Sequence, residues 1–219
     1  MDSSMANNPS RERIMERIRA GLRAPVKNAP QPAPALDDVF EPVLNPLERF
    51  QTEAQANLME CRITRDVNES AAQLAEVLQS LPEGEIFIQD SPLLRQLTQQ
   101  LTAQPIRWSS DGAPREISQA TVTLAESLVA QTGSIFVTAS CGGRGASVVA
   151  PCHIVFATTD QIVPDLYAAL SQAQQQGRFS QASYGCMISG SSRTADIEKI
   201  LVQGAHGPRR LVVILQRAA

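Results

Sequence analysis

The sequence predicts an α/β fold in which a mostly parallel sheet is flanked by helices. From residue 46 onward, short runs of apolar and β-branched residues alternate with longer stretches in which apolar residues recur every three or four positions. Strands that alternate with helices in this way are typical of α/β layer folds. The 219 residues, 43% of them apolar, can bury a core, and with only 4% aromatics that core must consist mainly of Ala, Val, Leu and Ile.

The N-terminal part of the chain differs in composition from the rest. Ser10 is placed to cap a helix over residues 11–22, with apolar side chains on one face and arginines on the other. The apolar positions are Ile14, Ile18 and Leu22. Prolines then recur through residues 24–45, and they indicate an extended arm because proline is excluded from helix and strand interiors. We therefore expect an N-terminal helix and proline-rich arm over residues 1–45, followed by one domain over residues 46–219.

Within this domain, hydrophobic periodicity predicts the elements in chain order. Helices are expected over residues 47–58, 70–81, 92–102, 163–176 and 195–202. Strands are expected over residues 62–64, 85–89, 106–108, 121–124, 134–138, 153–158, 184–189 and 211–216. Pro92 suits the first turn of its helix, and residues 146–149 are expected to add one helical turn.

Charge and cysteine usage argue against several classes of protein. The net charge of −3 and the pI near 5.5 leave no broad basic surface for nucleic acid or an anionic membrane. No apolar targeting segment and no run of ~20 apolar residues is present, so we expect a cytoplasmic protein without a membrane span. The spacing of the cysteines fits no zinc or iron–sulfur site, so reduced, mostly buried thiols and no metal are expected. The cysteines are Cys61, Cys141, Cys152 and Cys186.

Four short motifs carry residues that could bind or react with a ligand. In the first, a tight turn precedes a β-branched run, and Gly133 can supply a positive φ there. The candidate ligand-binding residues of this turn are Thr132, Gly133 and Ser134. Glu126 lies upstream and is expected to face the same crevice, as a catalytic acid or base. The alternative for this motif is a plain hairpin turn.

The second motif is the glycine-rich segment over residues 140–147. A turn between a strand and a helix exposes backbone N–H groups, so Gly143 and the guanidinium of Arg144 are candidates to bind a phosphate or carboxylate. The segment matches neither the P-loop nor the Gly-x-Gly-x-x-Gly dinucleotide motif. The alternative is a flexible surface loop, and Cys141 is interpreted as structural rather than reactive.

The third and fourth motifs flank the helix expected over residues 195–202. The small polar side chains and the arginine suited to hold an anion there are Ser191, Ser192, Arg193 and Thr194, with Thr194 as the N-cap. Asp196 either pairs with the helix dipole or serves as a base or nucleophile. His206 follows in a glycine-flanked turn, where an imidazole can perform acid–base chemistry or form a structural hydrogen bond. His153, in an apolar strand, is interpreted as a hydrogen-bonded core histidine.

Together these motifs resemble the LUD-domain family, with gaps, from Ser10 to the C-terminus. The most specific match is Ser192, Thr194-Ala195-Asp196-Ile197-Glu198 and His206-Gly207-Pro208. Supporting matches are Ser10-Arg11, Ile14, Ile18-Arg19-Ala20, Phe50, Ala130, Thr132-Gly133, Ile135, Arg144, Pro151 and His153. The chain departs from the family's pattern at Gln131, where Glu is usual, at Glu126, where Asp is common, and at Ser134, where Thr is frequent. An amide does not titrate, so Gln131 cannot replace an acid or base.

The resemblance implies a fold similar to the glucosamine-phosphate deaminase, ribose-phosphate isomerase and CoA-transferase group, with the site at the carboxyl ends of parallel strands. It also implies a role in oxidising lactate to pyruvate beside two partner proteins, at least one of which carries iron–sulfur clusters. This chain would be the non-redox subunit or accessory protein. It would bind a small anionic ligand and no redox cofactor of its own.

Two other functions stay open on the sequence. The first is a stand-alone enzyme of the sugar-phosphate isomerase or CoA-transferase type, with Glu126 or Asp196 as base or nucleophile. The second is an interaction module that binds no small ligand. In that module the basic helix and the proline-rich arm would contact partner proteins, because a short helix is marginal alone.

Overall fold

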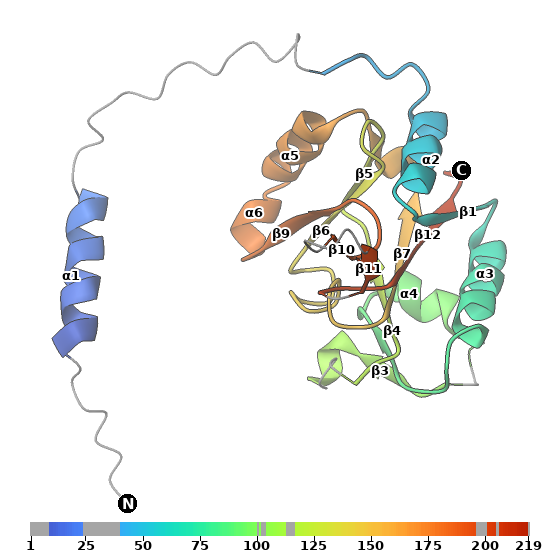
Figure 1. The fold of residues 1–219 in the computed structure, drawn as a ribbon, viewed down its shortest axis with the longest axis horizontal. Helices are drawn as coiled ribbons and strands as arrows, with labels where there is room; N and C mark the ends of the chain where they lie inside the picture. The colour runs from blue at the N-terminus through green and yellow to red at the C-terminus, as the bar shows by residue number, and fades with distance from the viewer. Residues whose placement is uncertain are drawn as a thin grey trace, which may run out of the picture. The chain divides into compact units, whose positions relative to one another are not determined.

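The computed structural model describes residues 9–23, 40–99, 101, 104–112, 117–195, 201–204 and 206–218 (Figure 1). The chain divides into two compact units, Met1–Phe40 and Glu41–Ala219. The first unit contains helix α1 (Pro9–Arg23), which confirms the helix predicted over residues 11–22. Ser10 lies within its first turn, so the expectation that Ser10 caps the helix is wrong. The proline-rich arm lies outside the described residues as far as position 39.

Six parallel strands form the central sheet of the second unit, in the order β1-β12-β7-β4-β2-β3. They are β1 (Glu60–Thr64), β2 (Ile86–Ile88), β3 (Ile106–Trp108), β4 (Ala120–Leu124), β7 (Cys152–Thr158) and β12 (Arg210–Gln216). Their bounds lie within two residues of predicted strands. The expected α/β fold with a mostly parallel sheet is therefore confirmed.

Helices flank this sheet and extend beside a second, smaller one. They are α2 (Pro46–Ala56), α3 (Val67–Gln79), α4 (Pro92–Leu97), α5 (Leu166–Gln175) and α6 (Arg178–Gln181), with short 3₁₀ turns at Ser109–Asp111 and Thr159–Gln161. Side-chain caps decide where three of them begin, because Asp66, Ser91 and Asp165 each accept a hydrogen bond from a backbone N–H three residues on. As a result, α3 begins three residues before its predicted start and α5 three residues after. Helix α4 begins as predicted but ends five residues earlier than predicted.

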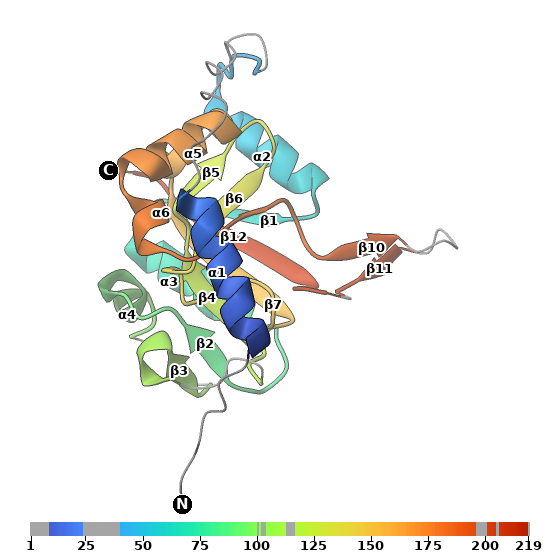
Figure 2. The ribbon, with the colours of Figure 1, turned by 90° about the vertical axis from the view of Figure 1, so that its left-hand side faces the viewer.

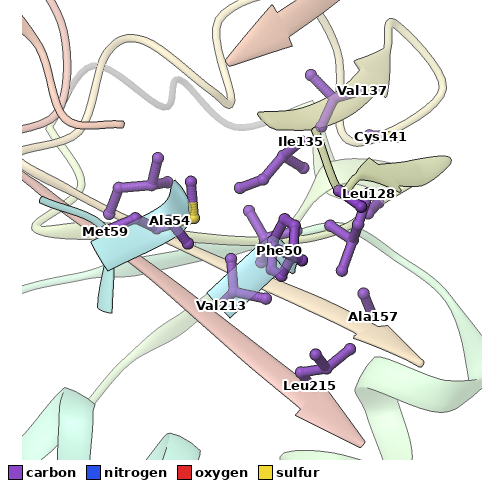
Figure 3. Packing of buried hydrophobic residues seen from close by; sticks show 14 residues of the cluster. Phe50, Ala54, Met59, Leu128, Ile135, Val137, Cys141, Ala157, Val213 and Leu215 are labelled. Carbon is purple, nitrogen blue, oxygen red and sulfur yellow. The ribbon is translucent and has the colours of Figure 1, made fainter. Parts of the chain in front are cut away.

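Buried apolar side chains form one cluster on each face of the central sheet. On one face, helices α3 and α4 pack against Ile154 and Ile214; on the other, Phe50 of α2 packs against Val213. Because side chains alternate between the faces of a strand, neighbouring residues of β12 belong to different clusters. Figure 3 shows Phe50 with Leu128 and Ile135 close by, so this cluster joins α2 to both sheets.

The second sheet has four strands in the order β8-β5-β6-β9. They are β5 (Ser127–Val129), β6 (Ser134–Thr138), β8 (Ile162–Val163) and β9 (Gly185–Ile188). Strands β5 and β6 are antiparallel and are joined by a turn in which Gly133 has a φ of 58°. The turn before β6 was predicted, but β5 and β8 were not. The motif at residues 132–134 therefore forms a hairpin turn, and its role in ligand binding stays a prediction.

The helix predicted over residues 195–202 is wrong. Strands β10 (Arg193–Ala195) and β11 (Leu201–Gln203) pair antiparallel instead, and Figure 2 shows them extending away from the central sheet. Ser192 and Gly204 are joined by a backbone hydrogen bond of 2.8 Å, which an intervening straight helix would not allow. Thr194 is therefore a strand residue and not an N-cap. Asp196 lies outside the described residues.

Candidate functional site

Hydroxyl groups meet at the β5–β6 turn, beside the end of α2. The hydroxyl of Ser134 shares hydrogen bonds of 2.7 Å with Thr132 and 2.6 Å with Ser189. Asn57 donates from its side chain to the carbonyl of Thr132 at 2.9 Å. Gly133 lies so close to α2 that a Cβ would be 2.5 Å from the backbone nitrogen of Ala54. The turn is therefore held firmly against the helix.

The segment from Ser189 to Ser192 leads from this turn to the loop around His206. The backbone N–H of Ser192 donates to the carbonyl of Pro208 at 2.8 Å. Ser191 is 7% exposed, and a Cβ at Gly207 would lie 3.1 Å from the Cβ of Ser192. The third and fourth motifs therefore come into direct contact. Arg193 is exposed at the start of β10, and the side chain of Thr194 is not described.

A cleft of about 440 Å³ opens beside this contact, and we call it the His206 cleft. It is lined by Val148, Val149, Pro151, Gly204, His206, Gly207 and Arg209. Val148 and Val149 are 43% and 38% exposed and form an apolar wall, and the side chains of His206 and Arg209 are also exposed. In the described part of the chain, no carboxylate forms an ion pair with Arg209.

The position of the cleft differs from the expected one. Pro151 directly precedes β7 and Arg209 directly precedes β12, so the cleft lies at the amino ends of these parallel strands. For the Ser191–Ser192 and His206 motifs, the expectation of a site at the carboxyl ends is therefore wrong. Arg209 was missed because nothing in the sequence except its place after the His-Gly-Pro run distinguishes it from other arginines.

Glu126 lies apart from the β5–β6 turn, at the other end of the hairpin. Its backbone N–H pairs with Phe136, and its carboxylate accepts a hydrogen bond of 2.7 Å from Thr138 and forms an ion pair of 3.1 Å with Arg178 of α6. Four residues of strand separate Ser134 from Thr138, roughly 13 Å at about 3.3 Å per residue. The expectation that Glu126 shares a crevice with Gly133 is therefore wrong, and its 11%-exposed carboxylate ties α6 to β6.

The glycine-rich segment lies in a loop, residues 139–151, in which several backbone N–H groups are hydrogen-bonded to other residues of the loop. Gly143 donates to Ala139, Ala146 to Gly143, and both Val148 and Val149 to Gly145. Two of these hydrogen bonds, 143 to 139 and 149 to 145, have the four-residue spacing of a helical turn, and residues 146–149 form a turn rather than a helix. Gly143 therefore offers no free N–H to an anion, contrary to the prediction.

Arg144 and Cys141 lie at the β6–β9 end of this loop. Arg144 is exposed, and its guanidinium donates to the hydroxyl of Ser183 at 3.2 Å. It is therefore placed with neither Ser134 nor Ser192, which lie past the opposite end of β9. Burial raises the pKa of the Cys141 thiol to about 11, so this thiol is protonated at neutral pH, in line with a structural role.

His153 and Gln131, which were also singled out in the sequence, lie in two different places in the structure. His153 is completely buried, its Nε2 lies 2.9 Å from the hydroxyl of Thr123, and burial lowers its pKa to about 4. Gln131, the departure from the family's pattern, lines a different cleft of about 310 Å³ with Glu48 and Arg49 of α2. Within the described ranges, no three His, Cys, Asp or Glu side chains gather as metal ligands, and no helix is long and apolar enough to cross a membrane.

Most of the second unit is similar to a known protein family. Residues 47–216 match the family model described as the LUD domain. The lactate utilization protein C of Deinococcus radiodurans is 36% identical over 92 residues, 40% of this chain and 41% of that protein, and the one of Bacillus velezensis is 30% identical over 49% of this chain and 48% of its own length. The chain thus spans less than half the length of these curated relatives.

Longer matches cover most of the second unit. The uncharacterized protein YkgG of Escherichia coli is 26% identical over 179 residues, 76% of this chain and 77% of that protein. A crystal structure of a DUF162 family protein from Deinococcus radiodurans has a TM-score of 0.61 at 20% identity, covering 78% of this chain and 96% of that one. At this level of identity the structural match shows a shared fold.

Proposed function

Because the chain belongs to the LUD-domain family, we propose that it serves lactate utilisation as a non-redox accessory protein that binds a small carboxylate in the His206 cleft. Relatives named lactate utilization protein C support the first part of this proposal. The cysteine spacing offers no iron–sulfur ligand set, so the clusters that the family resemblance implies belong to a partner protein.

The binding proposal rests on one observation: Arg209 and the apolar wall line the same cleft. A guanidinium binds a carboxylate through two parallel hydrogen bonds, and Arg209 has no carboxylate partner among the described residues. Val148 and Val149 line the same cleft and suit a short carbon chain. His206 adds a second polar group to the lining. A volume of about 440 Å³ is ample for an acid of three or four carbons.

A thermal-shift titration with L-lactate and pyruvate tests the proposal, with sugar phosphates and CoA thioesters as other ligand classes. A ligand at 100 times its Kd adds about 2.7 kcal/mol to the free energy of unfolding. For a domain of this size, that raises the melting temperature by about 5–10 °C. We expect this shift for the small carboxylates with the wild-type protein.

Two matched variants decide where the ligand binds. Arg209→Gln and Arg144→Gln each remove one exposed arginine and change the net charge equally. We expect Arg209→Gln to abolish the carboxylate shift and Arg144→Gln to retain it. Equal losses in both variants would indicate a general charge effect and would refute the His206 cleft as the site. A wild-type protein that no small ligand stabilises would favour the interaction module.

The stand-alone enzyme, the other function considered above, has less support among the described residues. Of its two candidate bases, Glu126 already accepts from Thr138 and pairs with Arg178, and Asp196 lies outside the described residues. In the glycine-rich loop, Gly143 donates its N–H to Ala139. No observation on the described residues favours phosphate binding there. Turnover of a sugar phosphate or an acyl-CoA by the purified chain would reverse this conclusion.

A further inference from the structure

A buried polar patch lies on the sheet face that the glycine-rich loop covers. Thr121 of β4 and His153 of β7 are partners in register, so their side chains project from the same face of the sheet. Thr123 lies two residues further along β4 and shares that face. All three residues are at most 1% exposed. Three polar side chains therefore interrupt a face that is otherwise apolar at Val155 and Val213.

Two atoms of this patch have no hydrogen-bond partner in the described part of the protein. They are Nδ1 of His153 and the hydroxyl oxygen of Thr121. The other ring nitrogen of His153 lies 2.9 Å from the hydroxyl of Thr123, so one side of the imidazole is satisfied and the other is not. Buried polar groups are nearly always paired, because an unpaired one loses its hydration without compensation. Two such atoms, on residues that are register partners of adjacent strands, therefore leave hydrogen-bonding capacity for a bound molecule.

The glycine-rich loop connects this patch to the His206 cleft. A Cβ at Gly142 would lie 3.4 Å from the ring of Phe87, which is the register partner of Thr121 on β2. Further along the loop, Ala150 is buried, while Val149 lines the cleft. The loop runs for thirteen residues between β6 and β7 without a helix or strand of its own, and such long loops are usually functional.

The spacing along the strands brings the patch within reach of Arg209. Pro151 lines the cleft two residues before His153, and Arg209 lies two residues before Leu211, the register partner of His153 on β12. Two residues of strand correspond to roughly 7 Å. Along the strands, the buried His153 therefore lies roughly 7 Å from Pro151, which lines the mouth of the cleft with Arg209.

We propose that His153 and Thr121 form the inner end of the ligand site and hydrogen-bond the C2 oxygen of a 2-hydroxy or 2-oxo acid whose carboxylate pairs with Arg209. This inference rests on the proposed function and names the substrate class that the cleft selects. A neutral imidazole offers one donor and one acceptor, and a threonine hydroxyl can do either. The pair can therefore bind both a hydroxyl and a carbonyl oxygen, whereas a plain carboxylic acid leaves both atoms unpaired.

Calorimetric titration of the full chain with L-lactate, pyruvate and propionate tests this proposal. Propionate has the same carboxylate and carbon chain but lacks the C2 oxygen. We expect wild-type protein to bind lactate or pyruvate at least about tenfold more tightly than propionate, because a site built around a substrate oxygen rejects the analogue that lacks it. Thr121→Val should reduce this preference to near one while leaving propionate binding unchanged. His153→Phe, whose ring carries no hydrogen-bonding nitrogen, provides a second variant with the same expectation.

Ser127→Ala is the matched control, since the Ser127 hydroxyl is also buried and unpartnered among the described residues but lies on β5, in the second sheet. Thr121→Val and Ser127→Ala should both raise the melting temperature of the ligand-free protein by roughly 2–4 °C or more, because each removes an unpaired buried hydroxyl. Only Thr121→Val should change the preference for the C2 oxygen.

The outcomes separate this inference from the proposed function. Equal binding of lactate and propionate that still depends on Arg209 would overturn the inner site and leave the carboxylate cleft standing. A lower melting temperature in Thr121→Val with the preference unchanged would also overturn it, because the hydroxyl would then serve the fold through a resident water. Absence of any carboxylate binding would refute the proposed function, and this inference with it.

Discussion

Replacing Gly133 with alanine should loosen the contact between the β5–β6 turn and helix α2. The new Cβ would lie 2.5 Å from both the nitrogen of Ala54 and the carbonyl carbon of Glu53, whereas ordinary contact begins near 3.4 Å. The two backbones must therefore separate by about 1 Å, at a typical overpacking cost of about 1–3 kcal/mol. Alanine at a φ of 58° costs about 1–2 kcal/mol more. We expect Gly133→Ala to lower the free energy of unfolding by about 2–5 kcal/mol.

Urea unfolding measures this loss, and Gly112→Ala supplies the control. Gly112 has a similar φ of 64°, but nothing lies within 4 Å of its Cβ position, so only the backbone term of about 1–2 kcal/mol applies. With a slope of about 1–3 kcal/mol per molar urea, the difference between the variants is resolvable. Equal losses in the two variants would show that α2 is not packed against Gly133 and would refute the reasoning.

Three further predictions concern the core and the pH dependence of stability. Phe50→Ala should lower the free energy of unfolding, measured in urea, by about 3–5 kcal/mol, because Phe50 is fully buried. As the control, Leu44→Ala, at a position that is 98% exposed, should change it by less than about 0.5 kcal/mol. Burial lowers the pKa of His153 to about 4 from an unfolded value near 6.5, so the unfolded state takes up a proton first as the pH falls. The free energy of unfolding should therefore fall between pH 6.5 and 4, by on the order of 3 kcal/mol. His153→Gln should flatten this dependence on pH, and an unchanged dependence would exclude His153 as its source. The hydrogen bonds from Arg210 hold the pKa of Glu60 in the folded protein below its usual value. Their contribution to stability is therefore present above the unfolded-state pKa and is lost as the pH falls through the folded-state pKa. Glu60→Gln should remove this contribution to the loss of stability in acid, and acid unfolding curves identical to those of the wild type would contradict the prediction.

Much of the central sheet could be predicted because its signals are local. Strands such as β7, with Ile154 and Phe156 on one face and Val155 on the other, are buried on both faces and therefore read as continuous apolar runs. Helix starts were less accurate, because Asp66 and Asp165 had to be identified as caps.

The second sheet and the β10–β11 hairpin could not be predicted from such signals. Strand β8 is two residues long, and it exists because Ile162 pairs with Leu128, more than thirty positions away. The apolar spacing over residues 195–202 also fits a helix. The hairpin is adopted there because the chain pairs Thr194 with Val202 and joins Ser192 to Gly204.

The sequence by itself determined the fold class, the family and the motifs that could carry chemistry, since these depend on composition, periodicity and short runs of residues. Only the tertiary structure decided which motifs meet. It joined Ser192 to the loop of His206, and it placed Glu126 beside Arg178 and Arg144 beside Ser183. It also exposed Arg209 at the amino ends of two parallel strands. The physical reason is that these contacts arise from pairing between distant strands, which sets position and burial without leaving a local pattern in the chain.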